Sequence, residues 1–202
     1  MDQPNGKARL LPFLQEADLA ISDVVIKREP LPPGAGFVQG PQQILEQVPG
    51  SNSLNLIRVT LSHKLENSKE GEVSLDLLEE SSGTQVLFRS AGAWLNVFAN
   101  GETLLFDEID TSLHPLLVKF LVERFHSEVT NPQNAQLIFT THNTSLLDQR
   151  IFRRDQIWFV EKDREASSKL YPLTDFQPRN DEDLERGYMR GRYGALPILG
   201  EI

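Results

Sequence analysis

Residues 103–108 read Thr-Leu-Leu-Phe-Asp-Glu, and the predicted fold depends on this stretch. An uninterrupted apolar run is typical of a strand covered on both faces, as in a parallel sheet. Asp107 and Glu108 follow it, and carboxylates at a strand end are costly unless they have partners or a chemical task. Ligands bind at the carboxyl ends of strands in open α/β sheets, so we expect a nucleotide and its magnesium here. One carboxylate can then hold a Mg²⁺-bound water while the other orients or deprotonates the attacking water.

A second apolar strand, predicted at 136–141, ends in the same way at His142. An amphipathic helix predicted at 114–129 connects the two strands, and a strand–helix–strand crossover places parallel strands side by side. Both strands therefore end at one edge of the sheet, and we expect His142 to lie near Glu108. An imidazole there can hydrogen-bond a terminal phosphate or the attacking water.

Residues 80–85 read Glu-Ser-Ser-Gly-Thr-Gln and precede a helix predicted at 82–99. We expect Ser82 to cap this helix and Gly83 to let the backbone approach a ligand closely. A capped helix N-terminus is a natural phosphate site. Taken alone, this Ser-Gly turn carries little weight, because such turns before helices are common.

The remaining pattern predicts an N-terminal region, 1–80, and an α/β lobe, 81–202. In the N-terminal region we expect a helix at 7–20 and a strand at 22–28, followed by a mobile Pro/Gly-rich loop or an insertion at 29–53. An antiparallel hairpin of 54–64 with 72–78 should complete the region. In the lobe we expect further strands at 156–161 and 169–172 and a helix at 181–189. The fold class is thus α/β, with a mainly parallel sheet flanked by helices.

The amino-acid composition excludes several kinds of site and partner. The 202 residues contain no cysteine, which excludes disulfides, thiolate catalysis and Cys-based metal sites. The net charge of −9 argues against direct nucleic-acid binding, which needs clustered Lys and Arg. We find no run of roughly 18 apolar residues and no signal peptide, so we expect no membrane span and a cytoplasmic location.

Together these motifs resemble the ABC-type ATPase family. Residues 82–85 resemble the signature motif, with Thr84 in place of the usual second glycine, and 104–108 resemble Walker B. Residues 109–114 resemble the D-loop, and His142 matches the switch histidine. The strings at 107–115 and 140–144 resemble bacterial AAA-type ATPases found beside abortive-infection, retron and other phage-defence genes.

The resemblance implies roles for these residues and two cofactors, ATP and Mg²⁺. Asp107 would be the metal-binding residue, Glu108 the catalytic base and His142 the sensor of the γ-phosphate. The other nucleotide-binding residues would be Ser82, Gly83, Thr84, Gln85 and Asp110. Because the signature motif closes on a partner's nucleotide, the resemblance implies a homodimer, and hydrolysis would switch an attached effector, plausibly a nuclease.

The sequence departs from this family in one respect. The family's Walker A loop has the form G-x-x-x-x-G-K-[ST], and no such string occurs here. Residues 34–40 are Gly-rich but lack the Gly-Lys-Ser/Thr end. We therefore expect the chain to be the C-terminal part of an ATPase head, inactive without a Walker A half.

Plainer interpretations remain open. Asp107 and Glu108 could be ordinary strand-end acids followed by a helix-capping Asp110, and His142 could be a hydrogen-bonded structural histidine. We expect His114 to cap the helix that begins at Pro115. The alternative function is a catalytically inactive, ATPase-like module that acts by binding a partner.

Overall fold

The computed structural model describes residues 6–17, 20–31, 44–51, 53–65, 71–163 and 165–197. The chain forms two compact units. The first comprises Met1–Phe106 and Thr111–Ile138, and the second comprises Asp107–Asp110 and Phe139–Ile202. The domain boundary expected after residue 80 stays a prediction.

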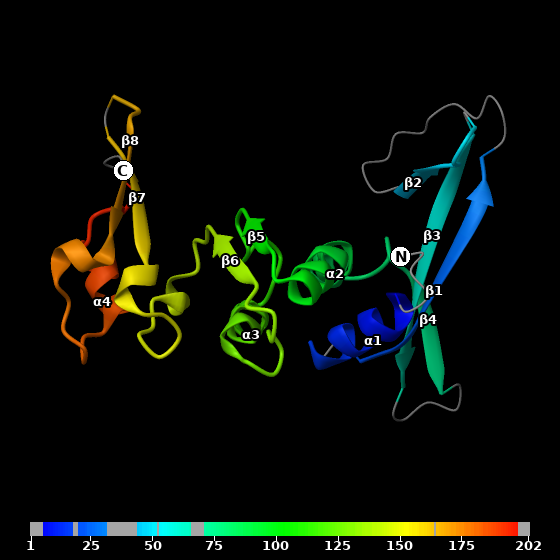
Figure 1. The fold of residues 1–202 in the computed structure, drawn as a ribbon, viewed down its shortest axis with the longest axis horizontal. Coiled ribbons are helices and arrows are strands. Elements are labelled where there is room, and N and C mark those ends of the chain that lie inside the picture. The colour runs from blue at the N-terminus through cyan, green and yellow to red at the C-terminus, as the bar shows by residue number, and fades with distance from the viewer. Residues whose placement is uncertain are drawn as a thin grey trace. The chain divides into compact units, whose positions relative to one another are not determined.

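The largest sheet of the first unit is antiparallel and is built on the long strand β3. Its strands are β1 (Ile21–Pro30), β2 (Ile44–Gln47), β3 (Leu54–Lys64) and β4 (Glu72–Asp76). One edge of β3 pairs with β1, and its other edge pairs first with β2 and then with β4 (Figure 1). The pairing of β3 with β4 confirms the predicted hairpin.

The prediction of a loop throughout 29–53 is wrong at β2. In this strand Leu45 pairs with Leu56, and Glu46 pairs with Asn55. A four-residue strand is too short to show an alternation of apolar and polar residues in the sequence. It forms here because the edge of β3 is available for pairing. The Gly-rich stretch at 34–40 and most of the predicted hairpin turn lie outside the described residues.

Three helices and two short strands complete the described part of the first unit. They are α1 (Gly6–Glu16), α2 (Ser82–Asn100), β5 (Thr103–Phe106), α3 (Pro115–His126) and β6 (Gln136–Phe139). Trp94 of α2 is fully buried, and its ring contacts Phe106 and Phe125 at centroid distances of 5.6 and 5.8 Å. Aromatic packing of this kind attaches α2 to the end of β5 and to α3.

Two helix starts show how capping sets the boundaries. His114 caps α3 through a hydrogen bond from the Leu116 amide to its Nδ1 at 3.2 Å, which confirms that prediction. The prediction that Ser82 caps α2 is wrong: the cap is Ser81, whose hydroxyl accepts the Thr84 amide hydrogen bond at 3.1 Å. An N-cap side chain accepts from the amide of the third helical residue, which here is Thr84. Ser81 is therefore the cap, and Ser82 is the first helical residue.

β5 and β6 form a two-stranded sheet. The Gln136 amide donates to the Glu102 carbonyl at 3.0 Å before the strands, and the Ile109 amide donates to the Thr140 carbonyl at 3.0 Å after them. Start is thus joined to start and end to end, which is parallel pairing. A helical crossover connects these two strands, whereas the other described pairs are antiparallel, so the predicted predominance of parallel strands is not observed among the described residues.

The prediction that residues 103–106 are covered on both faces is also wrong. Leu105 is 73% exposed and Ile138 of the neighbouring strand is 59% exposed, while Leu104 and Phe106 are half-buried. In the described part of the first unit, Trp94 of α2 contacts Phe106 of β5, whereas Leu105 and Ile138 present their apolar side chains to solvent.

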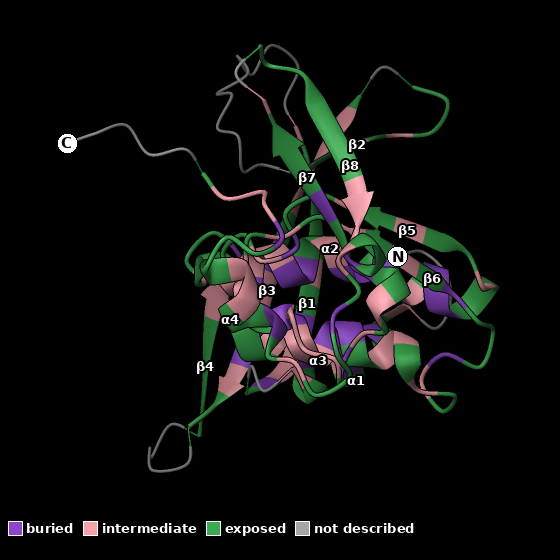
Figure 2. Ribbon diagram, turned by 90° about the vertical axis from the view of Figure 1, so that its left-hand side faces the viewer, coloured by how far each residue is buried: buried purple, intermediate pink, exposed green. Residues whose placement is uncertain are grey.

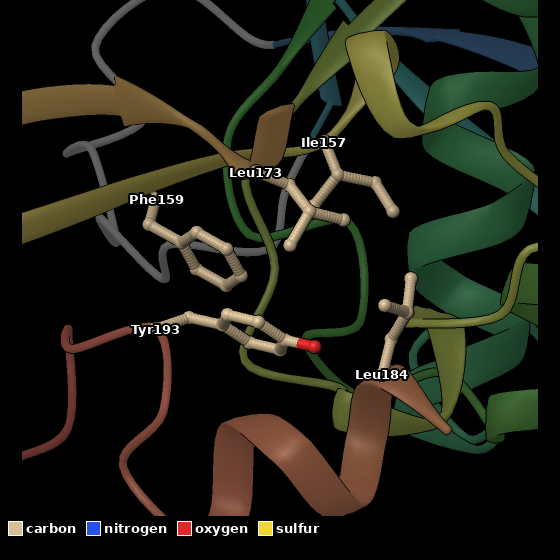
Figure 3. Close-up of a cluster of buried hydrophobic side chains, with 5 residues drawn as sticks. All are labelled: Ile157, Phe159, Leu173, Leu184 and Tyr193. Atoms are coloured by element: carbon tan, nitrogen blue, oxygen red, sulfur yellow. The ribbon is translucent and has the colours of Figure 1, made fainter. Parts of the chain in front are cut away.

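The second unit is built around an antiparallel hairpin. Its regular elements are β7 (Trp158–Lys162), β8 (Ser168–Pro172) and α4 (Leu184–Met189), with short 3₁₀ turns at Thr144–Leu146, Arg154–Gln156 and Leu173–Phe176. Its core consists of buried side chains from these elements (Figure 3): Ile157, Phe159, Leu173, Leu184 and Tyr193. Outside this core the hairpin strands are mostly exposed (Figure 2).

None of the described helices combines the length and the apolar character that crossing a bilayer requires.

Candidate functional site

The acidic residues after β5 are held by one hydroxyl group. Thr140, just after β6, donates its side-chain hydroxyl to Asp107 Oδ1 at 2.5 Å. The same oxygen accepts the backbone amide of Glu108 at 2.7 Å. Glu108 has φ 49°, a left-handed conformation that a side chain as large as glutamate rarely adopts. Thr140 therefore fixes both the carboxylate of Asp107 and the unusual backbone of Glu108.

Asp110 makes a second connection between the same two segments. Its Oδ1 accepts the Thr141 hydroxyl at 2.6 Å and the backbone amide of His142 at 3.2 Å. Between these contacts, Ile109 is fully buried. The two loops that follow β5 and β6 are thus joined at both ends, and the backbone position of His142 depends on Asp110.

The side chains of Glu108 and His142 lie at the same exposed edge. Glu108 Oε1 is 3.6 Å from His142 Nε2, and the two side chains are 56% and 84% exposed. An exposed pair at this separation contributes little to stability. What it provides is a carboxylate and an imidazole that can reach one solvent-side ligand atom together. The structure thus brings Asp107, Glu108, Asp110 and His142 into one small region of the second unit.

The predicted signature residues 82–85 belong to the first unit. Thr84 is buried, and its hydroxyl lies 2.8 Å from that of Ser81. The Gln85 side-chain amide donates to the Glu80 carbonyl at 2.9 Å. Ser82 is exposed at the helix start, and a Cβ on Gly83 would approach the Ser112 carbonyl oxygen to 2.9 Å. The side chains of Thr84 and Gln85 therefore shape the turn before α2.

Thr140 and Thr141 were not predicted as site residues. The signal in the sequence was their position directly before His142, but a hydroxyl at a strand end has many ordinary partners. Their bonds to Asp107 and Asp110 depend on which residues of the two loops face each other. That register becomes visible only in the three-dimensional structure.

The donor set of the site can be compared with what Mg²⁺ requires. Among the described residues, no group of three or more His, Asp or Glu side chains could hold a metal ion. Asp107 instead offers a single exposed carboxylate, one oxygen of which accepts the Thr140 hydroxyl. Magnesium in nucleotide sites is held by one or two carboxylates together with phosphate oxygens and water. The residues present thus fit an ion that arrives with a nucleotide, and do not fit a metal held by protein ligands alone.

Comparison with protein families gives one match. The family described as "AAA domain, putative AbiEii toxin, Type IV TA system" matches residues 5–148, which include both joined loops and the turn before α2. No match was found among curated proteins. Since the match covers well over half of the chain, it shows the family. The chain therefore belongs to this AAA-domain family, whose members are nucleotide-binding, ATPase-like proteins.

Proposed function

We propose that the edge formed by Asp107, Glu108 and His142 activates water in an ABC-type ATPase site. The observation that supports this most is the 3.6 Å approach of Glu108 to His142 on loops fixed by Thr140 and Asp110. Because the backbone amides of Glu108 and His142 are held by these bonds, the two residues need little backbone rearrangement when a ligand arrives. The family match supports ATP as that ligand.

Each residue of this edge has a distinct proposed role. Glu108 accepts a proton from the attacking water, for which its exposed carboxylate is suited. His142 hydrogen-bonds the terminal phosphate or the same water. Asp107 holds Mg²⁺ through a bound water, and the ion supplies charge neutralisation on the phosphates. Asp110 keeps the backbone of His142 in place.

The proposed site is composite. In this proposal the Ser82–Gly83 end of α2 closes on the nucleotide of a second copy, and the phosphate-binding loop comes from a segment or chain other than these 202 residues. ATP turnover would then switch an effector. The family description names a putative AbiEii toxin of a Type IV TA system, which supports a toxin-type effector. That this effector acts in phage defence and is a nuclease is our proposal.

A second candidate function is supported by a different observation. Leu105 and Ile138 expose an apolar face on a parallel strand pair, and parallel sheets are normally covered on both faces. A partner that covered this face would make the chain an ATPase-like interaction module. In that case Glu108 would have no role in turnover.

The experiment that tests the proposal measures MgATP binding and turnover for this chain and for a protein extended upstream to include a G-x-x-x-x-G-K-[ST] loop. We expect turnover only in the extended protein, and Glu108→Gln should lower kcat by about 10²- to 10⁴-fold, the usual contribution of a general base. Glu128→Gln, which changes an exposed glutamate after α3, is the matched control and should behave like wild type. Absence of turnover in the extended protein would contradict the proposal and favour the interaction module, and equal turnover in wild type and Glu108→Gln would contradict the role of Glu108 as the base.

A further inference from the structure

The chain after residue 148 lies outside the matched family region, yet it is bonded to the loop that carries His142. The Thr144 hydroxyl, two residues after His142, donates to Glu185 Oε1 at 2.6 Å. Glu185 belongs to the first turn of α4. The side chain that supports the loop thus comes from the far end of the second unit's sequence.

A second attachment lies five residues further along the same loop. The Gln149 side-chain amide donates to the carbonyls of Arg179 and Glu182 at 2.9 and 3.0 Å. Between His142 and these contacts the loop is stiffened by Asn143, whose Oδ1 accepts both the amide and the hydroxyl of Ser145 at 3.1 and 2.7 Å. A displacement of α4 would therefore be passed along a short, bonded segment to His142.

The segment that provides these contacts is itself firmly anchored. Leu184 and Tyr193 are buried in the core of the second unit (Figure 3). The Tyr193 hydroxyl donates to Glu182 Oε1 at 2.6 Å. Gly187 of α4 packs against the tyrosine ring so closely that an added Cβ would lie 2.8 Å from the hydroxyl oxygen. Asp183 caps α4 by accepting the Arg186 amide at 3.0 Å. An anchored helix can hold a loop in one place.

We propose that residues 179–193 form a brace that positions His142, with Glu185 and Thr144 as its positioning residues. Neither residue touches the nucleotide in this scheme; they act through the loop. The catalytic importance of the brace rests on the proposed function. Its existence as a device that places His142 rests on the contacts alone.

The test follows the ring signals of the histidines by NMR in this chain without nucleotide. The chain has only four histidines, and His142→Gln identifies the signal of interest. We expect Thr144→Val and Glu185→Ala to shift the His142 signal and to speed amide exchange at residues 143–147 by about two- to tenfold, the effect of losing one hydrogen bond. The signals of His63, His114 and His126 should stay in place.

Two further variants separate positioning from general damage. Thr144→Ser keeps the hydroxyl and should keep the wild-type His142 signal, and Arg186→Gln, an exposed neighbour of Glu185 on α4, should change nothing. If Thr144→Val disturbs all four histidines, Glu185→Ala decides. An unchanged His142 signal and unchanged exchange in Glu185→Ala would overturn the brace.

Turnover in the extended protein provides an independent readout. There we expect Glu185→Ala to lower kcat by about two- to tenfold with little change in KM for ATP, because Glu185 does not touch the nucleotide. Absence of turnover, or an unaffected Glu108→Gln, counts against the proposed ATPase function only. The histidine signal still decides whether the brace positions His142.

Discussion

At the scale of single residues, the site depends on hydrogen bonds that the Thr140 and Thr141 hydroxyls make with Asp107 and Asp110. The Thr140 oxygen accepts from the Glu108 amide and donates to Asp107, so one atom holds two residues with different proposed roles. Asp110 does the same for Thr141 and His142 with one carboxylate oxygen. Site geometry at this scale is therefore set by few bonds, each of which one substitution can remove.

Thr140→Val should show this most directly. The change keeps the shape of the side chain and removes both bonds, and we expect it to lower the free energy of unfolding by about 1–3 kcal/mol, because each typical hydrogen bond contributes about 0.5–1.5 kcal/mol net. Urea titrations measure this loss, and Thr140→Ser, which keeps the hydroxyl, should recover most of it. Equal losses in the valine and serine variants would show that the methyl group, and not the hydroxyl, matters.

At the scale of elements, the capped start of α2 fixes the turn that is proposed to contact a partner's nucleotide. Ser81 caps α2 with its side chain, and the exposed Ser82 follows as the first helical residue. The hydroxyl of Ser81 also lies 2.8 Å from that of the buried Thr84. The turn is thus built by Ser81 and leaves Ser82 at the surface.

The two serines give a matched comparison at this scale. Ser81→Ala should destabilise the chain by about 1 kcal/mol, the usual cost of losing an N-cap, because the Thr84 amide loses its acceptor. Ser82→Ala should change stability by less than about 0.5 kcal/mol, as is typical of surface substitutions. Thermal unfolding of both variants checks this. A larger loss of stability in Ser82→Ala than in Ser81→Ala would show that Ser82 is the cap.

The parts of this architecture that follow from the periodicity of apolar residues and from the connection between strands could be predicted from the sequence. The approach of His142 to Glu108 follows from two apolar strands joined by a helix, and the β3–β4 hairpin follows from alternation. The capping serine could not be predicted, because adjacent serines offer the same hydroxyl and only the backbone angles distinguish them. β2 and the contacts of Thr140 also depend on tertiary pairing, which local propensity does not encode.

At the scale of the whole molecule, stability depends in part on a buried tyrosine in the core of the second unit, Tyr193. Burial raises the pKa of Tyr193 to about 12, and its hydrogen bond to Glu182 acts in the same direction. That bond is also the main cause that lowers the pKa of Glu182. The C-terminal part of the second unit thus has its own dependence on pH.

This dependence gives a prediction for alkaline pH. The folded chain holds the Tyr193 proton more tightly than the unfolded chain, in which tyrosine ionises near pH ~10. The stabilisation is therefore complete below pH ~10 and is lost as the pH rises through about 12. Unfolding free energies at about pH 8 and about pH 11 should differ less in Tyr193→Phe than in wild type, although Tyr171, whose pKa burial also raises, leaves some slope. An equal slope in both proteins would contradict the assignment.

The left-handed backbone of Glu108 has a consequence for how this position tolerates random mutation. A non-glycine residue at φ 49° costs on the order of 1 kcal/mol relative to glycine. Selection for stability alone would thus favour glycine or asparagine at residue 108, because glutamate makes the folded chain less stable than either of them would. If glutamate is needed here for the proposed chemistry, a library of all substitutions at residue 108 should favour glutamate when it is selected for ATP turnover and glycine when it is selected for stability.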